Sequence, residues 1–107
     1  MMLESDENTF QTDISVAERV AVIFYSENCL PCKTMKEVLE KFSEMYEDIK
    51  IYNINVKKER RLAKRYGIQS VPTVIVFEDG QPVDKKFGTL SVSELKKLII
   101  EEKIPQM

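Results

Sequence analysis

Hydrophobic residues along the chain fall into two kinds of pattern. Residues 20–25 and 73–78 are continuous runs rich in β-branched and aromatic side chains, which predicts two strands buried on both faces. Residues 50–56 alternate less regularly and predict a third strand. Between these runs, apolar side chains three and four positions apart predict an amphipathic helix over about 29–47 and a short helix over about 58–66.

Turn and capping signals organise the C-terminal part. Asp79-Gly80 predicts a hairpin that leads from residues 73–78 into a more polar strand over 83–87. Ser91 and Glu94 form a capping-box pattern that opens a last helix, and Pro105 lies beyond its end. Residues 7–15 carry a weaker signal for a short helix.

Strands that alternate with helices predict right-handed crossovers and a mostly parallel sheet covered on both faces. The hairpin adds an antiparallel edge. The pattern therefore predicts an α/β fold with a central mixed β-sheet flanked by helices on both faces, and a length of 107 residues predicts a single domain over 1–107.

Composition excludes several classes of function. The chain has no histidine, so a Ser-His or Cys-His nucleophile pair and a His-ligated metal site cannot form, and two cysteines cannot alone supply a four-thiolate zinc site. A net charge of −2 argues against general nucleic-acid binding. The longest apolar run, residues 20–25, is too short to span a bilayer, and the acidic start is unlike a secretory signal. We therefore expect a soluble, cytoplasmic protein.

Charge is unevenly placed along this sequence. Residues 1–30 hold six acidic residues and a single basic one. Residues 57–65 hold one acidic residue, Glu59, and six basic residues: Lys57, Lys58, Arg60, Arg61, Lys64 and Arg65. A basic run on a short helix is usually its solvated face, so this interpretation is favoured over a partner-docking patch.

Both cysteines lie in Cys29-Leu30-Pro31-Cys32, between a predicted buried strand and a long predicted helix. A spacing of three residues on a first helical turn brings the sulfurs to one side, close enough for a disulfide. Free N–H groups and the helix dipole favour a thiolate there, and Pro31 needs no N–H. We expect an exposed, more acidic Cys29 and a more buried Cys32. An inert pair or a structural disulfide is the less favoured interpretation at a strand-to-helix turn.

Five blocks of residues, 24–33, 63–68, 71–73, 77–80 and 87–88, keep a common order and spacing. Together they resemble the thioredoxin family over roughly residues 9–104. The C-x-P-C block is moderately specific, and its combination with Val71-Pro72-Thr73 is highly specific.

The resemblance implies the thioredoxin fold, a central sheet flanked by four helices with Pro72 in cis beside the cysteines. It implies that the exposed backbone at Val71 pairs with a bound substrate strand and that Pro72 keeps metals out of the site. It also implies that a bound target lies across Cys29, the Val71-Pro72 turn and the corner at Gly88. In this scheme the Cys29 thiolate attacks a target disulfide, and Cys32 then attacks the Cys29 sulfur and releases the reduced target.

Several positions depart from the family's pattern. Asn28 stands where the family usually has Trp, and Leu30 replaces the common glycine. Ile23 occupies the strand position of a typically buried Asp, and Asn53 occupies that of its Lys partner. Losing both charges together is physically sensible, since removing one would leave the other unpaired in a low dielectric. Either proton removal from Cys32 is less assisted than is usual in the family, or the change is neutral core variation.

The resemblance therefore implies a protein-disulfide reductase, a thioredoxin-type electron carrier that acts on disulfide-containing client proteins. A separate reductase must regenerate the dithiol, because no G-x-G-x-x-G motif for a nicotinamide or flavin is present. We expect a monomer that needs no cofactor and no metal and binds neither nucleic acid nor membrane.

Two alternatives from other classes of protein remain. The first is a thioredoxin-like interaction module with incidental cysteines, which the departures at Asn28 and Ile23 favour. The second is a metal or Fe–S carrier that uses Cys29 and Cys32 from two chains, which the Pro72 block disfavours.

Overall fold

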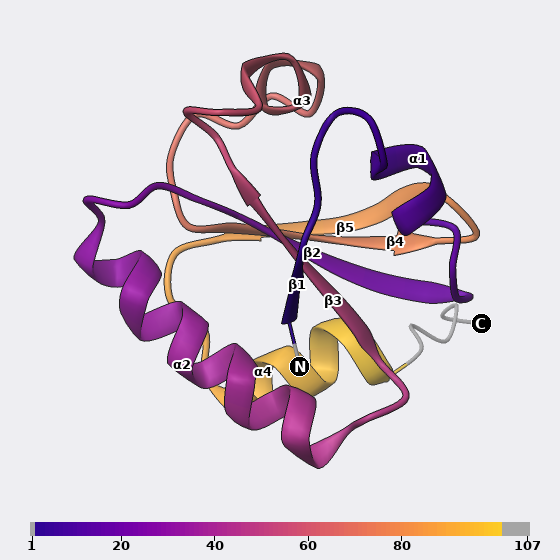
Figure 1. The fold of residues 1–107 in the computed structure, drawn as a ribbon. Helices are drawn as coiled ribbons and strands as arrows, with labels where there is room; N and C mark the ends of the chain where they lie inside the picture. Colours follow the sequence, from indigo (N-terminus) through magenta and orange to yellow (C-terminus); the bar gives the residue numbers. More distant parts are fainter. Residues whose placement is uncertain (1, 102–107) are drawn as a thin grey trace, which may run out of the picture.

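A computed structural model describes residues 2–101, which form one five-stranded sheet with helices on both faces (Figure 1). The elements in chain order are β1 (Met2–Glu4), α1 (Phe10–Asp13), β2 (Arg19–Tyr25), α2 (Leu30–Met45), β3 (Lys50–Asn55), α3 (Arg60–Arg65), β4 (Thr73–Glu78), β5 (Gln81–Phe87), α4 (Val92–Leu95) and the π-helix η1 (Lys96–Ile100).

The strand order is β1-β3-β2-β4-β5. Strands β1, β3 and β2 pair in parallel, whereas β4 is antiparallel to β2 and β5 is antiparallel to β4. Asp79 and Gly80 both have positive φ, 51° and 80°, as expected for a tight hairpin turn between β4 and β5. The predicted α/β class and mixed sheet are confirmed.

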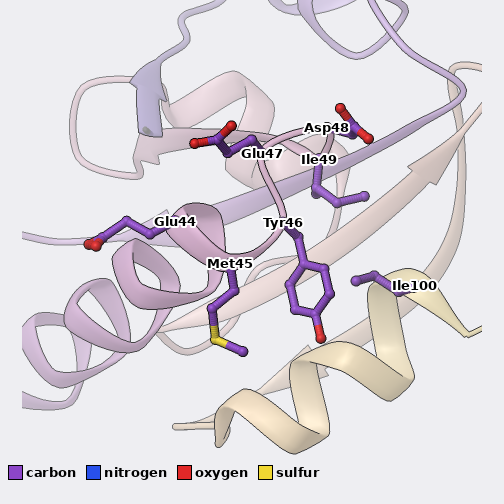
Figure 2. Close-up of a pocket in the computed structure, with 7 residues that line it drawn as sticks. All are labelled: Glu44, Met45, Tyr46, Glu47, Asp48, Ile49 and Ile100. Atoms are coloured by element: carbon purple, nitrogen blue, oxygen red, sulfur yellow. The ribbon is translucent and has the colours of Figure 1, made fainter.

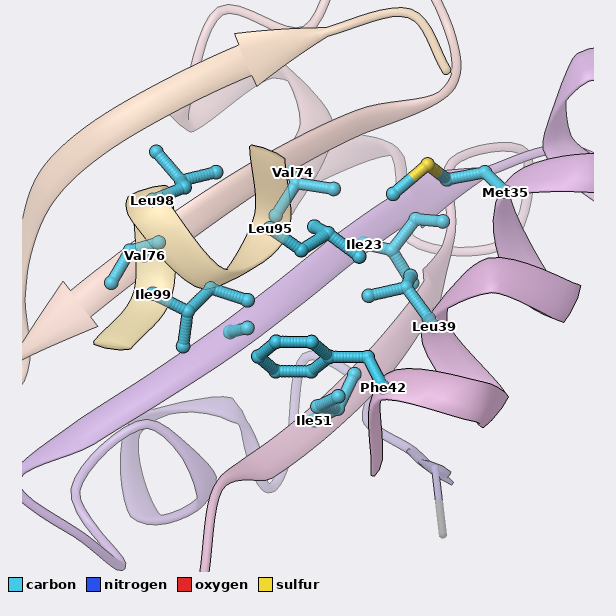
Figure 3. Packing of buried hydrophobic residues seen from close by; sticks show 11 residues of the cluster. Ile23, Met35, Leu39, Phe42, Ile51, Val74, Val76, Leu95, Leu98 and Ile99 are labelled. Carbon is cyan, nitrogen blue, oxygen red and sulfur yellow. The ribbon is translucent and has the colours of Figure 1, made fainter. Parts of the chain in front are cut away.

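Alternate side chains of the central strand β2 belong to two separate core layers, because successive residues of a strand face opposite sides. Ala21 and Ile23 pack with α2 and α4 in one layer (Figure 3). Val20, Val22 and Phe24 pack with α1 and α3 in the other. Burial on both sides explains why residues 20–25 are almost entirely apolar.

The predicted elements differ from the observed ones mainly at their ends. The long helix begins at Leu30 and ends at Met45, α3 covers only Arg60–Arg65, and β5 begins at Gln81. Within residues 7–15 the helix is α1. Strand β1 was not predicted, because its residues are mostly exposed and it is held by pairing to β3.

The last helix starts at the predicted capping box, where the Ser91 side chain accepts from the Glu94 backbone and the Glu94 side chain accepts from the Ser91 backbone. It continues as a π-helix, which the sequence pattern did not indicate. Arg19 donates to the carbonyl of Ile99 at 2.8 Å in this segment. Pro105 lies outside the described residues. Among residues 2–101, no helix has the length and apolar character needed to cross a membrane.

Candidate active site

The two cysteines lie where the buried strand β2 turns into helix α2. Cys29 is the N-cap of α2, and its Sγ accepts a hydrogen bond from the backbone N–H of Cys32 at 3.1 Å. Pro31 lies in the first turn, where a missing N–H costs the helix nothing. The N-terminus of the helix thus directs a hydrogen-bond donor and the positive end of its dipole at the Cys29 sulfur, which favours the thiolate when the pair is reduced.

Cys29 and Cys32 are joined by a disulfide, with their Cα atoms 5.1 Å apart. Cys29 is half-buried, whereas Cys32 is 1% exposed. The predicted order of burial is therefore confirmed. Leu30, between them, is 76% exposed, and Asn28 and Pro31 are also exposed.

Two segments distant in the sequence meet this turn. The Val71–Pro72 peptide bond is cis, as the resemblance implied, and the carbonyl oxygen of Val71 lies 3.8 Å from the Cys29 sulfur. The backbone N–H of Gly88 donates to the carbonyl of Pro72 at 2.9 Å. Gly88 has a φ of +90° and open space where a Cβ would project. The structure thus places Val71, Pro72 and Gly88 in one chain of contacts that leads to Cys29.

The strand positions beneath the helix carry no charge. Ile23 and Asn53 are partners in the register of β2 and β3, and Ile23 is fully buried among the apolar residues of the α2 layer. Asn53 is 7% exposed, and its Oδ1 accepts no hydrogen bond from any described residue. This part of the core therefore holds a neutral side chain and an unpaired amide oxygen, at the two positions named above as departures from the family's Asp and Lys.

A polar cluster that the sequence did not predict lies at the carboxyl end of β2. Tyr25 donates to Oε1 of Glu4 at 2.9 Å, and the ammonium of Lys36 on α2 lies 3.5 Å from the centre of the Tyr25 ring. Burial, followed by the hydrogen bond to Glu4 and the charge of that carboxylate, raises the pKa of Tyr25 to about 12. Glu4 belongs to β1, so without that strand nothing in the sequence pattern relates it to Tyr25.

A second unpredicted contact joins α2 to the loop after β5. The backbone N–H of Leu90 donates to Sδ of Met35 at 3.2 Å, and Met35 is fully buried one helical turn beyond Cys32. This contact links the helix that carries the cysteines to the loop that begins at Gly88. The hydrophobic pattern predicts only that Met35 belongs to the core, and it does not indicate the hydrogen bond to Leu90.

Neither the hollow of the surface at the far end of α2 nor any cluster of metal-ligating side chains among the described residues offers a second candidate site. A hollow of about 600 Å³, lined by residues 44–49 and Ile100, lies at the opposite end of α2 (Figure 2). Within the described part of the chain, no group of three or more His, Cys, Asp or Glu side chains is placed to hold a metal ion. The cysteine turn is accordingly the candidate site.

Comparisons with known proteins agree with this geometry. The family profile described as Thioredoxin matches residues 1–101. A thioredoxin of Mycoplasmoides gallisepticum is 34% identical over 86 residues, which cover 80% of this chain and 86% of that protein. A thioredoxin of Chlorobaculum thiosulfatiphilum is 31% identical over 100 residues, 92% of this chain and 93% of that protein. The structure of a mutant thioredoxin from Halobacterium salinarum NRC-1 superposes with a TM-score of 0.88 at 30% identity and covers 97% of this chain and 94% of that one.

Proposed function

Because this chain belongs to the thioredoxin family and is a thiol–disulfide oxidoreductase, we propose that its protein-disulfide reductase activity is carried by Cys29 and Cys32. The observation that supports this assignment is the half-buried Cys29 sulfur at the N-terminus of α2, bonded to the buried Cys32. One sulfur is placed to meet a partner, and the other is protected from it.

The reduced pair acts in two steps. The Cys29 thiolate attacks one sulfur of a client disulfide, forms a mixed disulfide and releases the other client sulfur as a thiolate. The Cys32 thiol loses its proton and attacks the Cys29 sulfur, which closes the Cys29–Cys32 disulfide and releases the second client sulfur. Two electrons pass to the client, and the client thiolates take up protons from Cys32 and from solvent. The backbone N–H of Cys32, which reaches the Cys29 sulfur, stabilises the attacking thiolate.

The client is proposed to lie across the surface that joins the three segments of the site. Its extended backbone pairs with Val71, Pro72 shapes the turn beside the Cys29 sulfur, and Gly88 leaves room for the approaching chain. Asn28 and Leu30 flank the attacking sulfur and present an amide and an apolar side chain to the client. Pro31 stiffens the loop between the two sulfurs.

The members of this family act on disulfide substrates and are recycled by a reductase partner. For this chain we propose a monomer that carries electrons in the cytoplasm from a thioredoxin reductase-type donor to client proteins. The return of two electrons from that donor reopens the Cys29–Cys32 disulfide after each cycle.

The test is reduction of a protein disulfide by the purified chain, with dithiothreitol as the electron source. Wild-type protein is expected to accelerate reduction, and Cys29→Ser is expected to abolish the acceleration. Cys32→Ser is expected to stop turnover after one mixed disulfide per molecule. A wild-type rate equal to that of dithiothreitol alone would favour the interaction module, and a visible absorption band of the purified chain would favour a metal or Fe–S carrier.

A further inference from the structure

We propose, on the basis of the reductase function proposed above, that six cations beside the site select clients whose disulfide is bordered by acidic residues. The six side chains are all exposed and form what is called here the basic surface: Lys57, Lys58, Arg60, Arg61, Lys64 and Arg65. They lie on α3 and on the turn that leads into it from β3.

The topology of the sheet places the basic surface next to the cysteines. Strands β2 and β3 are parallel and in register from Val20 with Lys50 to Tyr25 with Asn55, so both end at the same edge. The N–H of Val56 donates to the carbonyl of Tyr25 at 2.9 Å, and Asn55 Nδ2 donates to Oε1 of Glu27 at 3.3 Å. The loop that carries Cys29 and the turn that carries the first cations are therefore hydrogen-bonded neighbours.

The other end of α3 leads to the second segment of the site. The chain runs from Arg65 through residues 66–70 to Val71, whose carbonyl oxygen is 3.8 Å from the Cys29 sulfur. Lys85 on β5 donates to the carbonyls of Tyr66 and Gly67, which fixes the end of α3 to the sheet. A client held against α3 thus has a fixed position relative to the attacking sulfur.

No acidic side chain of the described residues forms an ion pair with the basic surface. Among residues 2–101 the ion pair of the structure joins Arg19 to Glu78, at the other end of β2. The Glu59 carboxylate accepts a hydrogen bond from the backbone N–H of Glu7, and the Glu27 carboxylate accepts one from the side-chain amide of Asn55. The Asp6 carboxylate accepts hydrogen bonds from the backbone N–H groups of Asn8 and Thr9, in the turn before α1. These three acids are engaged locally, and within residues 2–101 no carboxylate lies at ion-pair distance from the basic surface.

Folding alone does not favour this arrangement of charge. Arg60 and Lys64, and likewise Arg61 and Arg65, are four positions apart on one helix, and like charges at that spacing repel. Arg60 and Arg61 also lie in the first turn, where the helix dipole disfavours cations. Lys64 and Arg65 lie in the last turn, where the dipole favours cations, so the unfavourable contribution that remains is the repulsion within the two like-charge pairs. A run of mutually repelling cations that borders a reactive sulfur is better explained by binding than by solvation.

The partner that fits is an acidic protein surface. Charges at the rim of an interface raise the association rate of an oppositely charged partner and weaken as salt screens them. Nucleic acid is also anionic, but the chain carries a net charge of −2, and the proposed reaction requires a disulfide in the molecule that docks. The acidic residues are expected to border the client cysteine on the side that faces α3.

The test variant is Arg60→Glu with Arg61→Glu. It converts both repulsive pairs into Glu-to-cation pairs in the favourable orientation and places acids in the first turn, so α3 is expected to be at least as stable as in the wild type. The matched control is Lys50→Glu with Lys96→Glu, which changes the net charge equally. Lys50 and Lys96 are exposed, and Lys50 begins β3 at the edge opposite to the cysteines.

The probes are two synthetic disulfide peptides that are identical except for Asp and Glu, or Asn and Gln, beside one cysteine. At low salt the wild type and the control are expected to reduce the acidic peptide with a kcat/KM about three- to tenfold above that of the neutral one. High salt and the test variant should each remove this preference and leave the neutral peptide unaffected. The same experiment with a bare dithiol as the only reductant gives the intrinsic reactivity of each peptide.

Equal kcat/KM for the two peptides, or a preference that survives in the folded test variant, would overturn the inference while the reductase function stands. Failure of the wild type to reduce even the neutral peptide would instead refute the reductase function. Tight binding of a short DNA duplex that the test variant loses would assign the basic surface to nucleic acid and overturn the inference as well.

Discussion

Replacing Ile23 by Asp tests whether the uncharged core beneath the cysteines limits the second chemical step. Ile23 is fully buried among apolar side chains and has no solvent-accessible surface. Its replacement forfeits about 1.5–3 kcal/mol of apolar burial, and an unpaired buried charge costs several kcal/mol more. Because domains unfold with about 5–15 kcal/mol in total, the single variant is expected to be largely unfolded or to hold the new carboxyl neutral.

Adding Asn53→Lys supplies a positively charged partner for the carboxylate that Ile23→Asp introduces. Asn53 is opposite Ile23 in the strand register, and its Oδ1 accepts no hydrogen bond from the described residues, so the wild-type amide is poorly satisfied. Breaking a buried pair by removing one partner costs about 3–5 kcal/mol, so the double variant is expected to recover about that much of the stability lost in Ile23→Asp. Urea unfolding of the wild type and both variants measures this.

The kinetic assay follows the second step alone. A mixed disulfide is formed between Cys29 and a chromogenic thiol, and release of that thiol by Cys32 is recorded. A positioned base contributes about 10²–10⁴-fold in proton transfer, and we expect about ten- to a hundredfold acceleration in the double variant. Ile23→Leu is the control and should release the thiol at the wild-type rate. A folded double variant no faster than the wild type would show that Ile23 is neutral core variation.

Three further outcomes are expected. Brief iodoacetamide treatment of the reduced protein should label Cys29 before Cys32, because Cys32 is buried, and mass spectrometry would expose the opposite order. Leu30→Gly should lower kcat/KM for apolar clients about tenfold or less, and Gly88→Asp should lower it more. Because Gly88 has a φ of +90°, thermal unfolding of each variant must accompany the kinetics. A folded, fully active Gly88→Asp would contradict the docking surface. The fold raises the pKa of Tyr25 from 10.0 to about 12, so the folded state favours the neutral phenol. The stability that this phenol contributes is present below pH 10 and is lost as the pH rises to about 12. Tyr25→Phe should make the unfolding free energy less dependent on pH in this range.

Local sequence patterns predicted the parts of the fold that are set by burial. Residues 20–25 are apolar because β2 is covered on both faces, and Ser91 with Glu94 marks the start of α4 because the cap is made by neighbouring residues. Strand β1 was missed because Leu3 is 45% exposed and the strand is defined by hydrogen bonds to β3, which is distant in the sequence. The π-helix was missed although its backbone bonds are local, such as that from the Glu101 N–H to the carbonyl of Lys96, because the apolar spacing of this segment fits an α-helix as well.

In the candidate site, too, local sequence predicted some features, whereas others depend on tertiary contacts. The spacing of Cys29 and Cys32 at a strand-to-helix turn predicted their relative burial and their disulfide from local physics. The approach of Val71 and Gly88 depends on tertiary contacts, and only the resemblance to a family indicated it. The contact between Tyr25 and Glu4 had no signal at all, because it requires the strand that the pattern did not predict.

The central assignment is that Cys29 attacks the client and Cys32 resolves the mixed disulfide. The most direct measurement mixes reduced Cys32→Ser and reduced Cys29→Ser, separately, with one disulfide-containing client and maps the covalent adducts by mass spectrometry. The assignment predicts that Cys32→Ser accumulates a stable adduct through Cys29, and that Cys29→Ser forms almost none because the remaining thiol is buried. Rapid adduct formation through Cys32, with no adduct through Cys29, would contradict it.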